Sequence, residues 1–113
     1  MTYLKLIPEI QCWPTWIRDR GLFDNVDPDS LGITTELAIA LHRWSDVWDS
    51  TYDLVNDPGN PKFPSEDSER TFWREGAELA HRLRGELGPG WSVEYSPESR
   101  YPDALLCSKT AGA

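Results

Sequence analysis

The residues around His42 are the first in this sequence whose types and spacing could do chemistry. His42 and Asp46 lie four residues apart, as a general base and its orienting carboxylate would on one helix face. Ser45 or Ser50 would then be the nucleophile. However, Ser45 points to another side of such a helix, and the sequence has no GxSxG elbow. We therefore assign no catalytic residue.

Metal and thiol chemistry have still less support. The stretch 53–60 offers oxygen ligands from Asp53, Asn56, Asp57 and Asn60. It lacks the closing glutamate and the ordered glycine of an EF-hand loop, so we interpret these residues as turn-forming. Cys12 has no cation closer than Arg18 to activate its thiol. We therefore expect no metal and no cofactor.

The two cysteines give no further motif. Cys12 and Cys107 are too far apart for a CxxC pair or a zinc-ligand spacing. In a reducing cytosol they are most simply free thiols, although a disulfide that joins the two ends stays open as an alternative.

Length and charge bound the kind of protein. A chain of 113 residues fits one domain, and we expect a single α+β domain over 1–100 and a flexible C-terminal tail over 101–113. The net charge of −8 disfavours binding to nucleic acid or anionic lipid, which need clustered lysine and arginine. Neither a membrane span nor a signal peptide is apparent, so we expect a cytoplasmic protein.

Hydrophobic patterns predict the elements. Tyr3–Ile17 is apolar and interrupted by prolines, which indicates one strand or two short strands bent at Pro8, and 21–32 is a turn-rich loop. Helices are predicted over 35–53 and 66–87, and a strand over 91–95. The expected fold is β-α-α-β: a small antiparallel sheet covered on one face by an antiparallel pair of helices.

The apolar stripe of each predicted helix identifies the core. In the first helix the stripe comprises Leu37, Leu41, Trp44, Trp48, Thr51, Tyr52 and Val55. In the second helix Gly76 lies in the middle of the stripe, where its missing side chain would allow close approach of another helix or of an indole.

Acidic residues concentrate in the first half of the chain. Nine of the 19 acidic residues lie between residues 19 and 57, against two arginines. On the first predicted helix, steps of four, three and four residues stack a set of polar side chains: His42, Asp46, Asp49 and Asp53. This face is either simply solvated or binds a basic partner and steers its approach.

Trp13 and Trp16 raise a second question about surface. In a regular strand they lie on opposite faces, so one indole must point away from the helices. That indole either packs on the tail or a neighbouring loop, or belongs to an exposed patch for a partner.

Several short motifs resemble a known group of proteins. They are the Cys12-Trp-Pro strand, Asn25-Val-Asp-Pro28, Leu41-x-x-Trp44 and Glu86-Leu-Gly-Pro-Gly-Trp91. Over residues 10–95 the chain resembles small acidic uncharacterised proteins of actinobacteria, some of which are similar to immunity proteins of toxin systems. The resemblance carries no catalytic residues and implies a binding protein.

We therefore predict a non-enzymatic, acidic protein-binding module, such as an immunity protein that covers a basic site on its cognate toxin. The predicted partner-binding residues are His42, Asp46, Asp49, Asp53, Trp13 and Trp16. The alternatives are a small enzyme or enzyme subunit that uses His42 and neighbouring acids, and an acidic mimic of nucleic acid. Self-association of the chain is open as well.

Overall fold

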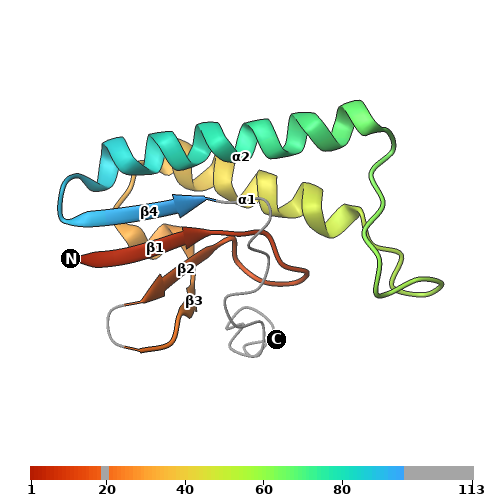
Figure 1. Ribbon diagram of the computed structural model, residues 1–113, viewed down its shortest axis with the longest axis horizontal. Helices are drawn as coiled ribbons and strands as arrows, with labels where there is room; N and C mark the ends of the chain where they lie inside the picture. The colour runs from red at the N-terminus through yellow and green to blue at the C-terminus, as the bar shows by residue number, and fades with distance from the viewer. Residues whose placement is uncertain (19–20, 96–113) are drawn as a thin grey trace.

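The computed structural model describes residues 1–18 and 21–95, which form a four-stranded sheet with two helices on one of its faces (Figure 1). The predicted tail over 101–113 lies outside the described residues. In chain order the elements are β1 (Thr2–Leu6), β2 (Thr15–Arg18), β3 (Asp24–Val26), the 3-10 helix η1 (Pro28–Leu31), α1 (Thr35–Ser50), α2 (Glu66–Leu87) and β4 (Trp91–Tyr95). The predicted α+β class and the strand, helix, helix, strand order are confirmed.

The sheet has the order β3-β2-β1-β4 and is mixed rather than antiparallel. β1 pairs antiparallel with β2 but parallel with β4, so the predicted antiparallel pairing of 91–95 with the first strand is wrong. The cause is the connection over 27–34, which returns the chain before α1 begins. α1 therefore runs in the same direction as β1, and β4 regains that direction after α2 (Figure 1).

The N-terminal segment forms two strands, one of the two predicted alternatives, but they pair antiparallel as a hairpin instead of bending at Pro8. Between them the Ile7 N–H donates to the Pro14 carbonyl at 2.9 Å, which closes the hairpin. The predicted loop over 21–32 contains β3 and η1 instead of irregular chain alone. Asn25 explains β3, because its buried side chain donates to the carbonyls of Trp13 and Thr15 on the neighbouring segment.

Side-chain caps set the helix ends. The Thr34 hydroxyl accepts from the Leu37 N–H at the start of α1, and the Ser65 hydroxyl accepts from the Ser68 N–H at the start of α2. α2 has the predicted bounds. α1 ends at Ser50, three residues early, because the Thr51 hydroxyl bonds the Trp48 carbonyl and the Thr51 carbonyl accepts from the Lys62 N–H.

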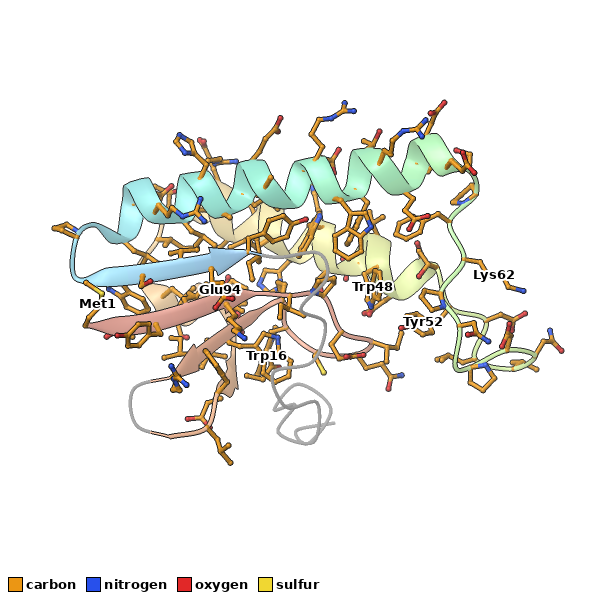
Figure 2. All side chains as sticks on the ribbon, in the orientation of Figure 1. Met1, Trp16, Trp48, Tyr52, Lys62 and Glu94 are labelled. Carbon is orange, nitrogen blue, oxygen red and sulfur yellow. The ribbon has the colours of Figure 1, made fainter. Side chains whose placement is uncertain are left out.

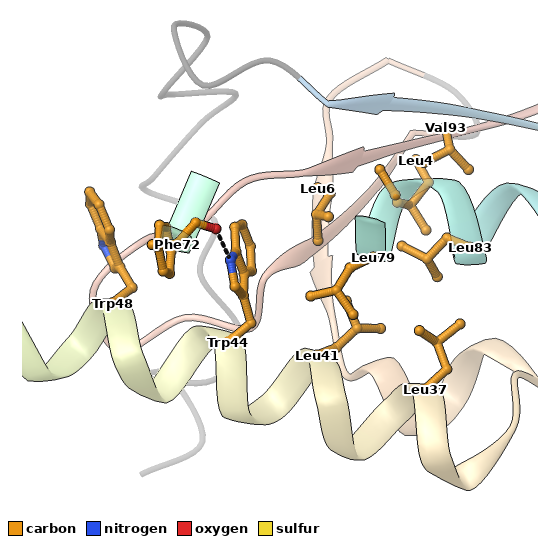
Figure 3. Packing of buried hydrophobic residues seen from close by; sticks show 11 residues of the cluster. Leu4, Leu6, Leu37, Leu41, Trp44, Trp48, Phe72, Leu79, Leu83 and Val93 are labelled. Carbon is orange, nitrogen blue, oxygen red and sulfur yellow. Dashed lines mark hydrogen bonds between the residues drawn. The ribbon is translucent and has the colours of Figure 1, made fainter. Parts of the chain in front are cut away.

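The main core lies between the helix pair and the sheet (Figure 3). Its largest members are two tryptophans of α1 against Phe72 of α2. Trp44 stacks on Phe72 with ring centroids 4.6 Å apart, and its indole N–H donates to the Phe72 carbonyl at 2.8 Å. Leu4, Leu6, Leu37, Leu41, Leu79, Leu83 and Val93 complete the apolar layer. The predicted helix stripes are confirmed as core except at Val55, which lies beyond the end of α1 and is 89% exposed.

Gly76 lies where α2 meets this core most closely. The indole of Trp44 and the ring of Tyr95 occupy the space that a side chain at position 76 would need. The Tyr95 hydroxyl donates to the Trp73 carbonyl at 2.7 Å, and burial raises the pKa of this phenol. The predicted close approach of an indole at Gly76 is therefore confirmed.

A second, smaller cluster lies on the other face of the sheet and contains Ile7, Cys12 and Trp16, with Phe23 packed against it. Trp16 is fully buried there, and its indole N–H donates to the Ile7 carbonyl. Cys12 is disulfide-bonded, so the expectation of a free thiol is wrong for this residue. The expectation for Cys107 lies outside the described residues. Cysteine spacing gave no sign of the bond, because spacing does not tell which side chains meet in the fold.

Neither described helix is both long and apolar enough to cross a bilayer. The outer face of α2 instead carries charged side chains along its whole length (Figure 2).

One carboxylate joins the end of α2 to the start of α1. Glu86 accepts from the Thr34 N–H at 2.7 Å and from the Thr34 hydroxyl at 2.8 Å. These bonds, the backbone one first, hold the pKa of Glu86 below its usual value of 4.5. Because the folded state binds the proton less readily than the unfolded state, the bonds stabilise the fold above pH 4.5 and lose this effect below it.

We therefore expect stability to fall more steeply on acidification below pH 4.5 in the wild type than in Glu86→Gln. The measurement is the urea midpoint as a function of pH. Glu78→Gln is the matched control, since Glu78 is also exposed on α2 but makes no such bond to another described residue, and it should follow the wild-type profile. Parallel profiles for all three proteins would contradict the assigned role of Glu86.

Candidate partner-binding surface

The structure separates the four residues that were predicted to stack along the first helix. His42 turns toward η1, where its Nε2 lies 3.2 Å from an oxygen of Asp29 and 3.4 Å from one of Asp27. Asp27 is also the cap of η1, since its side chain accepts from the Asp29 N–H. His42 therefore packs against two acids that the sequence pattern had assigned only to a turn.

Asp49 has a structural contact as well. Its carboxylate accepts from the N–H of Gln11 at 3.0 Å, and Gln11 has a left-handed backbone with φ of 58°. One turn earlier, the buried Ser45 hydroxyl donates to the Cys12 carbonyl. This side of α1 therefore holds the loop between β1 and β2 in place.

Asp53 lies beyond the end of α1 and caps a turn. Its carboxylate accepts from the Asn56 side chain and from the N–H groups of Asn56 and Val55. These bonds, with Asn56 the main donor, lower the pKa of Asp53. Asp57 accepts from Asn60 and pairs with Lys62 at 3.3 Å, which lowers its pKa too. The turn-forming interpretation of 53–60 is confirmed.

Asp46 is the one member of the predicted set that is exposed with no hydrogen bond or salt bridge within the described part of the chain. Together with the acids on either side of it, it forms what we call the acidic surface: Asp27, Asp29, Asp46, Asp49 and Asp53. The spacing of α1 could predict only part of this surface. Asp27 and Asp29 join it through a tertiary contact with His42, and no sequence period marks that contact.

The two tryptophans have different positions. Trp16 is on the sheet face away from the helices and is completely buried (Figure 2), so it is corrected from a partner-binding residue to a core residue. Trp13 is half-buried, and its main chain is bonded on both sides to Asn25. Trp13 is therefore the only one of this pair with indole surface for a partner.

The side chains that a hydrolytic site would need do not converge. Ser45 is buried against the Cys12 carbonyl, and the Ser50 hydroxyl donates to the Val47 carbonyl one turn back. His42 points to η1, away from both serines. Within the described residues, the two serines and the histidine named for the enzyme alternative are thus each engaged with another partner.

A groove of about 350 Å³ runs between α1 and α2. Its floor is apolar, from Ala40, Trp44, Val47 and Leu79, and its rim is charged, from Arg43, Glu75, Glu78 and Arg82. The stripes predicted from the sequence did not indicate this groove. The signal was present in Val47, an apolar residue outside the predicted stripe of the first helix.

A comparison with curated proteins gives no match to this chain. A comparison with protein families does give one. The model of a family described as Serratia CdiI immunity protein-like matches residues 2–98, which covers every strand and helix described above. This extends the resemblance to immunity proteins noted over residues 10–95 so that it also includes β1. The chain belongs to the Serratia CdiI immunity protein-like family.

Proposed function

We propose that this chain is an immunity protein that binds a cognate toxin protein and blocks its activity. The observation that carries the proposal is the family match over residues 2–98. The serines and His42 are engaged in structural contacts, which favours a binding role over the alternative of a small enzyme.

The acidic surface is the part of the molecule that we assign to the toxin. Asp46 is exposed and has no salt-bridge partner among the described residues, and the nearest basic residue in sequence is Arg43. A surface with an excess of acidic side chains attracts a basic one and accelerates its approach. We infer that the toxin presents a basic site to this surface, and that Trp13 adds apolar contact at its edge.

The mimicry of nucleic acid is less well supported. A mimic needs carboxylates at regular spacing, whereas the acids of this surface are turned to different local partners, such as Gln11 for Asp49 and Asn56 for Asp53.

The expected cytoplasmic location belongs to the same proposal, because an immunity protein must meet its toxin where the toxin acts. The disulfide at Cys12 bears against this location, since cytosolic thiols are kept reduced. Thiol titration of the protein isolated from its native host distinguishes a reducing from an oxidising location. A reactive thiol at Cys12 would support the cytoplasmic location, and its absence would contradict it.

The direct test uses the protein encoded by the neighbouring gene. Co-expression of this chain should protect cells from growth arrest by that protein, and the two purified proteins should form a stable complex. Toxicity that is unchanged by this chain, together with no complex, would reject the proposed function.

A charge variant tests the acidic surface within that complex. Asp46, Asp49 and Asp53 changed together to asparagine should leave the fold intact, since an asparagine oxygen can still accept the backbone bonds of positions 49 and 53. The association rate should fall, and its dependence on salt should become shallower, because screening acts on charges already removed. Stopped-flow measurement at several ionic strengths gives both values.

The matched control removes three exposed acids elsewhere, through Asp24→Asn, Glu66→Gln and Glu94→Gln. It changes the net charge equally, so it should slow association less than the first variant. Equal rates and equal salt slopes for the two variants would assign the acidic surface to solvation.

A further inference from the structure

The groove between α1 and α2 combines a partly exposed apolar floor with charges of both signs. Trp44 closes its base and is almost fully buried, whereas Val47 is 44% exposed. A second hollow, lined by Val47, Phe72 and Glu75 among others, continues it toward the start of α2. The groove thus follows the helix pair over several turns.

The charged side chains of the rim form no salt bridges with other described residues. Among residues 1–18 and 21–95, no salt bridge includes Arg43, Arg82, Glu75 or Glu78. By contrast, Glu86 near the end of the same helix has a near partner in Thr34. Two arginines and two glutamates also leave the rim without net charge, although the chain as a whole carries −8.

The order of these charges along α2 makes the groove complementary to itself. Glu75 and Arg82 are seven residues apart, which is about 10 Å along the helix axis. If a second α2 crosses the first in the opposite direction near Leu79, Arg82 of each copy faces Glu75 of the other. A two-fold axis repeats every such contact, so both pairs form at once.

We propose that the groove is the contact between two copies of this chain, related by a two-fold axis. The occupant is a second copy rather than a differently charged partner, because the groove matches itself in charge. The net charge of −8 makes two copies repel each other, but the rim of the groove carries no net charge and so adds little to this repulsion. In such a dimer Val47 and its surroundings pack against the same residues of the other copy. This inference does not depend on the proposed function.

The area of the contact between the two copies determines how strongly they associate. α2 is about 33 Å long, and two helices at ordinary spacing offer roughly 500 Å² per copy, less than the roughly 800 Å² of a standard stable interface. The dimer should therefore be weak and dissociate on dilution through the micromolar range.

Sedimentation velocity over a concentration series tests the dimer. Val47→Asp should weaken self-association about tenfold or more, because a carboxylate would be buried at the centre of the contact. Ile39→Asp is the matched control: Ile39 is also on α1 and is 45% exposed, but it does not line the groove, so its association should equal that of the wild type.

Charge reversal tests the pairing itself. Glu75→Arg and Arg82→Glu should each be monomeric alone, since like charges then face each other across the axis. An equal mixture of the two variants should associate, because opposite charges face each other again at both positions. No contact to a toxin predicts that recovery.

A wild-type chain that stays monomeric at about 1 mM, the weak limit of specific association, would overturn the inference. So would association that Val47→Asp and Ile39→Asp weaken equally. If the neighbouring gene's product binds the chain and loses affinity only with Val47→Asp, while the chain alone is monomeric, the groove belongs to that partner and the dimer is rejected. A wild-type chain that dimerises but neither binds nor neutralises the neighbouring gene's product would instead reject the proposed function alone.

Discussion

Replacing Trp44 with alanine is expected to lower the free energy of unfolding by about 3–5 kcal/mol, as for other large-to-small changes of buried aromatics. The indole is only 2% exposed and lies flat on Phe72. Its loss would leave a cavity between the helices and remove the donor to the Phe72 carbonyl. Urea denaturation followed by circular dichroism measures the change.

Trp44→Phe separates the two contributions. A phenyl ring keeps most of the stacking but not the N–H, so this variant should lose about 1–3 kcal/mol, as expected for an unsatisfied buried carbonyl with a smaller packing loss. A Trp44→Ala protein that unfolds at the wild-type midpoint would show that the packing of α1 on α2 is misassigned.

The second large effect is expected at Gly76. A Cβ atom at this position would lie 2.6 Å from Cζ2 of Trp44 and closer still to the Tyr95 hydroxyl. Trp44 and Tyr95 are both held by hydrogen bonds to α2 carbonyls, so neither ring can move away freely. Gly76→Ala should therefore destabilise the fold by about 1–3 kcal/mol or more, despite the better helix propensity of alanine.

Gly85 provides the control on the same helix. A Cβ there meets no atom within 4 Å, so Gly85→Ala should stabilise the protein by about 0.5–1 kcal/mol. Opposite signs for the two substitutions are the expected result in thermal or urea unfolding. If both stabilise, the close packing at Gly76 is wrong.

Local signals explain why some elements could be predicted from the sequence. The bounds of α2 follow from Ser65 and Gly88, which act on the nearest helical turn, and its buried face follows from a regular period. The end of α1 could not be predicted in this way. It depends on the bond between Lys62 and Thr51, eleven residues apart, which no propensity of the helix itself reports.

The direction of β4 was predicted wrongly, and the acidic surface was predicted only in part, for the same physical reason. Both depend on the segment over 27–34. Its turn-forming residues predict that the chain turns there, but they do not predict in which direction it continues. That path returns the chain so that α1 runs parallel to β1, and it also brings Asp27 and Asp29 to His42. The burial of Trp16 could not be predicted from the alternation of residues in a strand. Such a pattern assigns a residue to one face of the sheet but does not show what covers that face.

The parallel pairing of β1 with β4 bears on how the protein is made. Residues 2–6 and 91–95 come from opposite ends of the described chain, so the sheet is completed only after almost all of it has been synthesised. Until then Leu4 and Leu6 lack Val93 beside them, and one edge of β1 stays open for pairing with another chain. Contacts this distant in sequence also slow folding. A nascent chain of this protein is therefore at risk of aggregation until β4 has been synthesised.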